Sequence, residues 1–130
     1  MRVFSRQAIP PPPDLKPLPV HPLLDIEIGC GVGFHPIRYA LANPERKLVA
    51  FERTHEKFLK FSRRFERHGC PGNLAPVHGD AIAWLAHAAS PASAQKIFIL
   101  YPNPNPKAAQ KNLRWAYAPA AQLLHEILVP

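Results

Sequence analysis

"DIEIGCGVGFH", residues 25–35, is the stretch of the sequence that decides the fold. An apolar run carrying the acid Glu27 ends in a loop with three alternating glycines, Gly29, Gly31 and Gly33. Glycine adopts positive φ easily and allows a ligand to approach the backbone closely. Because helical spacing begins a few residues later, the stretch predicts a strand, a tight ligand-binding loop and a helix in succession.

Strand and helix patterns alternate along the rest of the chain. The apolar runs predict strands at residues 23–29, 47–51, 74–79 and 96–101, of which the third is interrupted by Pro76. Helical spacing and end signals predict helices at residues 36–43, between Thr54 and Gly69, and at residues 81–89 and 119–128. This alternation implies right-handed crossovers and a mostly parallel sheet with helices on both faces. We therefore expect an α/β, Rossmann-like fold.

The first part of the chain has a different composition. Residues 1–22 contain seven prolines. Since proline fixes φ and lacks an N–H, this segment is predicted to be an extended, partly polyproline-like arm and not a packed element. The expected organisation is an N-terminal arm at residues 1–22 followed by a ligand-binding domain at residues 23–130.

The chain is strongly basic. Sixteen Lys and Arg residues against nine Asp and Glu residues give a formal charge of +7 and an isoelectric point near 9.9. Such a charge suits an anionic partner such as nucleic acid or an anionic surface, although a soluble basic protein is the plain alternative. Five of the cations fall in the helix predicted between Thr54 and Gly69, where a solvated helix face is the favoured interpretation. They are Lys57, Lys60, Arg63, Arg64 and Arg67.

Several classes of protein are disfavoured. The two cysteines, Cys30 and Cys70, have no metal-type spacing, so neither a metal site nor a disulfide framework is expected. No run approaches the about 20 apolar residues of a membrane span, and the N-terminus has no apolar segment of the kind found in signal peptides. The expected location is therefore the cytoplasm.

Acidic residues follow three successive predicted strands at their carboxyl ends. Glu27 beside the glycine loop suits a cationic ligand, such as an amino group or a sulfonium, better than a pyrophosphate. Glu52 lies 19 residues after Gly33, where a carboxylate can accept hydrogen bonds from both ribose hydroxyls. Asp80 and Ala81 form a third loop that suits an adenine amino group. Each residue alone could serve as a turn, a surface charge or a helix cap, but together they favour an adenosine-type cofactor.

These motifs resemble known families. The E-x-G-x-G-x-G pattern with Glu52 and Asp80 resembles class I S-adenosylmethionine-dependent methyltransferases, while the glycine spacing disfavours a nicotinamide dehydrogenase. "FILYPNPNPK", residues 98–107, resembles the Phe-Pro-Asp-Pro-Trp-Pro-Lys signature of the bacterial tRNA (guanine-N7)-methyltransferase family. The resemblance implies S-adenosyl-L-methionine as cofactor, tRNA as partner and guanine N7 as methyl acceptor. The cofactor-binding residues that it implies are Glu27, Gly29, Gly31, Gly33, Glu52, Asp80 and Ala81.

The resemblance gives the alternating prolines a role. A rigid loop can hold the target base beside the methyl donor at little cost in entropy. Asn103 is implied as the catalytic position, with the alternative that it only caps a turn. The implied substrate-binding residues are Tyr101, Asn103, Asn105, Lys107 and Arg114.

The sequence departs from the family pattern at two of these positions. Asn103 stands where the family has aspartate, and an amide cannot accept two hydrogen bonds from guanine as a carboxylate does. Asn105 replaces a tryptophan and so removes a stacking surface. Two alternatives therefore stay open: a methyltransferase acting on a small molecule or protein, and a non-catalytic paralogue that binds the cofactor or RNA.

The expected sheet is also shorter than the family fold. Three further strands are usual in class I methyltransferases, so the resemblance implies a chain that is truncated at its C-terminus. The strand at residues 96–101 would then have an exposed apolar edge. We expect poor stability or self-association through this edge.

Overall fold

The computed structural model describes residues 5–100 and 120–130. A short 3-10 turn, η1 (Arg6–Ala8), precedes alternating strands and helices. These are β1 (Leu24–Ile28), α1 (Phe34–Ala42), β2 (Lys47–Glu52), α2 (His55–Arg67), β3 (Leu74–His78), α3 (Ala81–Ala88), β4 (Lys96–Phe98) and α4 (Ala121–Ile127).

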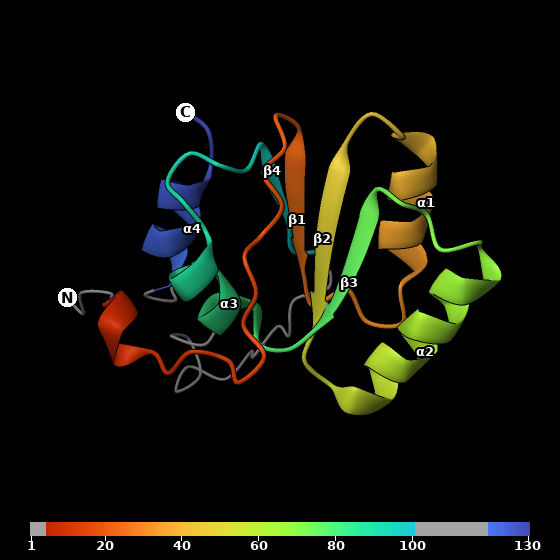
Figure 1. The fold of residues 1–130 in the computed structure, drawn as a ribbon, viewed down its shortest axis with the longest axis horizontal. Coiled ribbons are helices and arrows are strands. Elements are labelled where there is room, and N and C mark those ends of the chain that lie inside the picture. The colour runs from red at the N-terminus through yellow and green to blue at the C-terminus, as the bar shows by residue number, and fades with distance from the viewer. Residues whose placement is uncertain (1–4, 101–119) are drawn as a thin grey trace.

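The four strands form one parallel sheet in the order β3-β2-β1-β4. Figure 1 shows α1 and α2 on one face and α3 and α4 on the other. Two separate apolar clusters fill the layers, one under α3 and α4 and one under α1 and α2. The α/β fold with a parallel sheet and helices on both faces is confirmed.

Strand β1 is buried on both of its faces, as the central strand of a parallel sheet requires. Its residues Leu24, Ile26 and Ile28 pack into the cluster under α3 and α4. Strand alternation directs the intervening Asp25 and Glu27 to the other face, where both are fully buried. The strand that leads into the glycine loop therefore carries two buried acids, which need partners.

Pro76 does not interrupt β3, so that part of the prediction is wrong. The Gly79 N–H donates to the Glu52 carbonyl at 3.0 Å, and the Leu48 N–H donates to the Asn73 carbonyl at 2.9 Å. Because N–H groups alternate in direction along a strand, position 76 faces away from β2. Since β3 lies at the edge of the described sheet, the missing N–H of proline costs no ladder hydrogen bond.

The N-terminal arm is packed, contrary to the expectation from its prolines. Ile9, Leu15 and Leu18 lie against the apolar cluster under α3 and α4. Arg6 donates to the Ala89 carbonyl and pairs with Glu126, each at 3.3 Å. Figure 1 shows the arm running past α3 before it enters β1. The prolines exclude regular structure, but the apolar residues between them still bury surface.

The ends of several elements differ from the prediction. Helix α1 begins at Phe34, two residues before the expected start, and holds Pro36 in its first turn, where proline is tolerated. Thr54 occupies the N-cap of α2 without a side-chain cap bond. Gly69 ends α2 at a φ of +81°, as expected of a helix C-terminal glycine. Strand β4 is described as three residues long, and its predicted end at Tyr101 lies outside the described residues.

Candidate functional site

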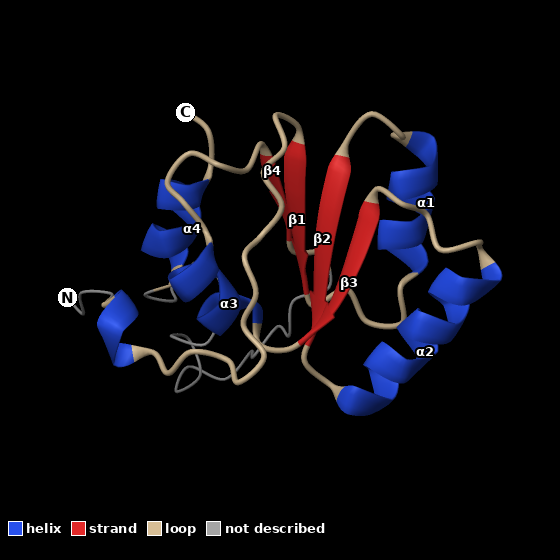
Figure 2. Cartoon of the chain, viewed as in Figure 1, coloured by secondary structure: helices blue, strands red, loops and turns tan. Residues whose placement is uncertain are grey.

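The glycine loop lies at the carboxyl end of β1 and is tied to the end of β2. Figure 2 shows the arrows of β1, β2 and β3 pointing toward the same edge of the sheet. The N–H groups of Gly29 and Cys30 both donate to the Phe51 carbonyl, at 2.9 and 3.0 Å. The Gly33 N–H donates to the Cys30 carbonyl at 3.2 Å. The loop is therefore a fixed turn that links β1 to α1.

The three loop glycines have different structural roles. All have positive φ, between 63° and 94°. A Cβ on Gly33 would lie 2.2 Å from Cδ1 of Phe61, so only glycine lets the loop pack on α2. A Cβ on Gly29 or Gly31 would meet no other atom within 4 Å. The loop thus leaves open space above these two glycines, where a ligand can reach the backbone.

Glu52 links the glycine loop to the start of α2. Its carboxylate is buried, with Oε1 accepting from the Gly31 N–H at 2.9 Å and Oε2 accepting from the Thr54 N–H at 2.8 Å. A carboxylate offers about four acceptor sites, so each oxygen can still accept one more hydrogen bond. The structure brings Glu52 to the glycine loop as predicted, and adds an anchoring role that the sequence did not reveal.

The loop amides favour one kind of ligand over another. Four of the five N–H groups of residues 29–33 donate within the chain, to Phe51, Cys30 and Glu52. A pyrophosphate site needs such amides to point at the ligand. A neutral or cationic group fits this loop better, in agreement with the buried acids Glu27 and Glu52 beside it.

Glu27 is paired with a residue that the sequence analysis missed. His35 Nδ1 lies 2.5 Å from Glu27 Oε1, and its ring packs edge-on against Phe98 of β4 at 5.0 Å. Burial raises the pKa of Glu27, and the hydrogen bond from His35 opposes this rise. Burial and the charges of Glu27 and Glu52 also raise the pKa of Cys30, so this thiol stays protonated. Glu27 is therefore a desolvated acid beside the loop, suited to a cation.

A second buried acid, Asp25, is held by two more missed residues. Arg46 donates to both of its carboxylate oxygens, at 2.6 and 2.8 Å, and the Tyr39 hydroxyl donates at 2.7 Å. Burial and then the bond to Asp25 raise the pKa of Tyr39 to about 12, which keeps this hydroxyl protonated as a donor. His35 and Tyr39 are four residues apart on α1. Side chains four residues apart lie on the same face of a helix, and Asp25 and Glu27 lie on the same face of β1. This match is the signal that could have revealed His35 and Tyr39 as partners of the two acids.

Asp80 and Ala81 lie at the third strand end, as predicted. The exposed Asp80 caps α3, because its Oδ1 accepts from the Ile82 N–H at 3.0 Å. The cap uses Oδ1 and not Oδ2. Ala81 is buried at the first position of α3. Nearby, the buried indole N–H of Trp84 has no hydrogen-bond partner among the described residues, and a Cβ on Gly79 would lie 2.7 Å from it.

The predicted substrate-binding residues follow β4 along the chain. Tyr101, Asn103, Asn105, Lys107 and Arg114 lie outside the described residues. The strand that leads to them, β4, pairs with β1 in parallel register. Within the described ranges, no helix is long and apolar enough to cross a bilayer. The same ranges hold no group of three or more His, Cys, Asp or Glu side chains arranged for a metal ion.

Comparison with known proteins identifies similar families and folds. A family model described as "Putative methyltransferase" matches residues 22–130. A tRNA (guanine-N(7)-)-methyltransferase of Anaeromyxobacter dehalogenans is 33% identical over 81 residues, covering 62% of this chain and 40% of the relative. One from Roseobacter denitrificans is 32% identical over 123 residues, covering 91% of this chain and 52% of the relative. The chain thus spans about half the length of such relatives.

A solved structure supports the same fold. The crystal structure of an RNA methyltransferase from Salinibacter ruber, in complex with S-adenosyl-L-homocysteine, has a TM-score of 0.55. It is 21% identical and covers 85% of this chain and 62% of its own. This likeness supports the fold alone.

Proposed function

This chain belongs to the methyltransferase family whose model matches residues 22–130, and from this membership we propose that it is an S-adenosylmethionine-dependent methyltransferase acting on tRNA. The proposed methyl acceptor is guanine N7, as in the relatives with which the chain shares about a third of its aligned residues. The observation that carries the cofactor assignment is the open space above Gly29 and Gly31 beside the Glu52 carboxylate.

The residues present fit an adenosine-type sulfonium ligand. Glu52 keeps an acceptor site on each oxygen for the two ribose hydroxyls. The desolvated Glu27 favours the positive charge of the methionyl amino group or sulfonium. Asp80 is proposed to accept from the adenine amino group through Oδ2. When bound, S-adenosylmethionine supplies a methyl group activated by its sulfonium.

The remaining task of the protein is to orient the acceptor. Guanine N7 carries its own lone pair, so the chain needs no general base to activate it. The proposed wall comprises Tyr101, Asn103 and Asn105, with Lys107 and Arg114 as cations for the tRNA. Holding the base in line with the transferred methyl group supplies the rate enhancement through orientation.

Incubation with labelled S-adenosylmethionine and unmodified tRNA, followed by nucleoside mass spectrometry, tests the proposal. Labelled 7-methylguanosine is the expected product. Binding of S-adenosylhomocysteine without transfer to any tRNA would instead support a non-catalytic paralogue. Methyl transfer to a small molecule or protein, with none to tRNA, would refute tRNA as the substrate.

Gly31→Ala is expected to weaken S-adenosylhomocysteine at least tenfold, because its new Cβ enters the open space proposed for the ligand. Gly69→Ala is the matched control, since Gly69 also has positive φ and free space around a Cβ but lies at the end of α2. Both variants should lose about 1–2 kcal/mol of stability from left-handed backbone strain. Calorimetry and urea unfolding measure the two effects, and equal affinities for both variants would remove Gly31 from the site.

Asn103→Ala is expected to lower turnover about tenfold while leaving S-adenosylhomocysteine affinity nearly unchanged, because a wall residue contacts the acceptor and not the donor. Asn103→Asp restores the acceptor pair for guanine and should raise N7 methylation. Steady-state methyl transfer and calorimetry on the three proteins check both statements. If alanine lowers the unfolding free energy but leaves turnover unchanged, Asn103 only caps a turn.

A further inference from the structure

Helix α2 carries four cations at positions that fall on one face. Lys60, Arg63, Arg64 and Arg67 follow the i, i+3, i+4, i+7 spacing and span about 10 Å along the helix. We call these four residues the α2 basic face. The apolar stripe of the helix lies elsewhere, because Phe61 is fully buried and Phe58 and Phe65 pack against the same core cluster.

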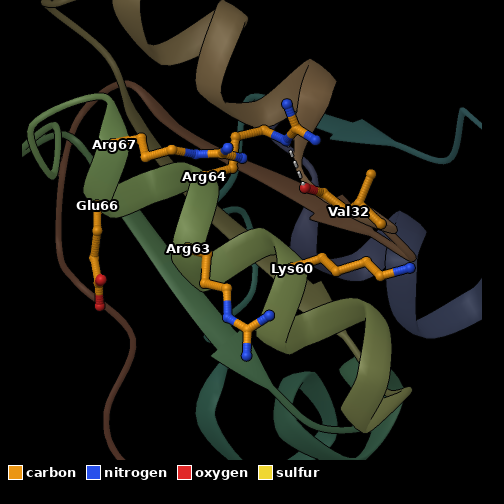
Figure 3. Close-up of a pocket in the computed structure, with 6 residues that line it drawn as sticks. All are labelled: Val32, Lys60, Arg63, Arg64, Glu66 and Arg67. Atoms are coloured by element: carbon orange, nitrogen blue, oxygen red, sulfur yellow. Dashed lines mark hydrogen bonds between the residues drawn. The ribbon is translucent and has the colours of Figure 1, made fainter.

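The α2 basic face lines a groove next to the glycine loop. The groove has a volume of about 810 Å³ and is bounded by the four cations together with Val32 and Glu66. Figure 3 shows the side chains of Lys60 and Arg64 of α2 lying next to Val32 of the glycine loop. Glu66 is the one acid among these lining residues, so the groove is strongly positive.

Arg64 connects this groove to the glycine loop. Its Nε donates to the Val32 carbonyl at 3.2 Å (Figure 3). Its Cζ lies 3.8 Å from the centroid of the Phe34 ring. The guanidinium is thus held in place by its neighbours. A ligand anchored on the α2 basic face would therefore lie beside the loop of the proposed cofactor site.

Two other cations remain available for a ligand. The side chains of Arg63 and Arg67 are exposed and form no ion pair or hydrogen bond with residues 5–100 or 120–130. Lys60 lies 3.9 Å from the exposed Glu56, a separation typical of weak surface pairs. Guanidinium groups bind phosphate with paired hydrogen bonds, so these two arginines suit successive phosphates of a phosphodiester backbone.

We propose that the α2 basic face binds the phosphate backbone of the RNA substrate and so places that RNA beside the glycine loop; this rests on the proposed function. A membrane surface fits less well, because the phenylalanines of α2 pack against the core cluster, so the exposed side of α2 has single apolar residues such as Leu59 in place of the continuous apolar face that enters a bilayer. The exposed aromatic ring beside the α2 basic face is that of Phe34, which lies against the Arg64 guanidinium. Four cations beside one such ring favour contact with phosphates over stacking on successive bases.

The test compares Arg63→Gln/Arg67→Gln with Lys47→Gln/Lys96→Gln. Each double variant removes two positive charges, but Lys47 and Lys96 begin β2 and β4 at the opposite end of the sheet. Fluorescence anisotropy with an unmodified tRNA transcript is measured at several salt concentrations. Losing two phosphate contacts should weaken binding about tenfold and reduce the salt slope by roughly 1.4–1.8. The salt slope of the control variant should differ from that of the wild type by less than about half of this change.

Parallel measurements separate this inference from the proposed function. S-adenosylhomocysteine affinity should be unchanged in both double variants, and thermal melts establish that each is folded. Wild-type tRNA affinity and slope in the arginine variant would overturn the inference, even if methyl transfer to tRNA is observed. Tighter binding of phosphatidylserine vesicles or polyglutamate than of tRNA would also overturn it. Groove-dependent tRNA binding without S-adenosylhomocysteine binding would support the RNA surface while refuting the cofactor assignment.

Discussion

Glu52→Ala is expected to weaken S-adenosylhomocysteine binding by about 1.5–3 kcal/mol, roughly ten- to 150-fold. The substitution removes the proposed acceptor of the ribose hydroxyls. It also removes the partner of the Gly31 N–H and the Thr54 N–H, at 2.9 and 2.8 Å. Both losses weaken binding: the first removes a contact from the bound state, and the second loosens the glycine loop of the free protein, which must then be ordered when the ligand binds.

Two further variants separate these contributions. Glu52→Gln keeps one carbonyl oxygen for Gly31 but places an amide donor toward a second N–H, so an intermediate affinity is expected. Glu56→Ala removes an exposed carboxylate at the start of α2 and controls for net charge. Calorimetry on the wild type and the three variants makes the comparison. Equal affinity for Glu52→Ala would end the ribose assignment, and tighter binding of NADH would reject the cofactor class.

The sequence could predict the parts of this fold that depend on local patterns. Alternating apolar runs and helical spacing were sufficient to predict the parallel sheet, and the three loop glycines were sufficient to predict the turn after β1. Glu52 could be placed because the carboxyl ends of neighbouring parallel strands meet at one edge of the sheet. These inferences need only the period of each element and the direction of the strands.

Other features depended on tertiary contacts that no local pattern contains. Pro76 is harmless only because β3 is an edge strand and position 76 faces outward. The proline-rich arm packs because α3 and α4 present an apolar surface to Ile9 and its neighbours. The partner of Glu27 proved to be His35, which becomes visible only when α1 is laid on the face of β1 that carries the acids.

Arg46→Met is expected to lower the free energy of unfolding by about 3–5 kcal/mol, because it leaves the buried carboxylate of Asp25 without its charged partner. Asp25 has no exposed surface, and Arg46 donates to both of its oxygens. Tyr39 alone then supplies a hydrogen bond, which does not balance a buried charge. Domains of this size have about 5–15 kcal/mol in total, so the variant should be close to unfolding at 37 °C.

A double substitution shows whether the uncompensated charge is the cause. Asp25→Asn with Arg46→Met removes the charge and the partner together, so it should recover more than half of the lost stability, although either single variant is destabilised. Arg38→Met on the exposed side of α1 is the control for removing an arginine and should change stability by less than about 0.5 kcal/mol. Urea unfolding followed by circular dichroism gives the four values. If Arg46→Met matches Arg38→Met, the ion pair is not what holds the amino end of β1 against the loop between α1 and β2. If the double variant is less stable than either single one, the bidentate geometry contributes more than the desolvation of Asp25 costs, and the buried acid is a net source of stability for the strand that carries the glycine loop.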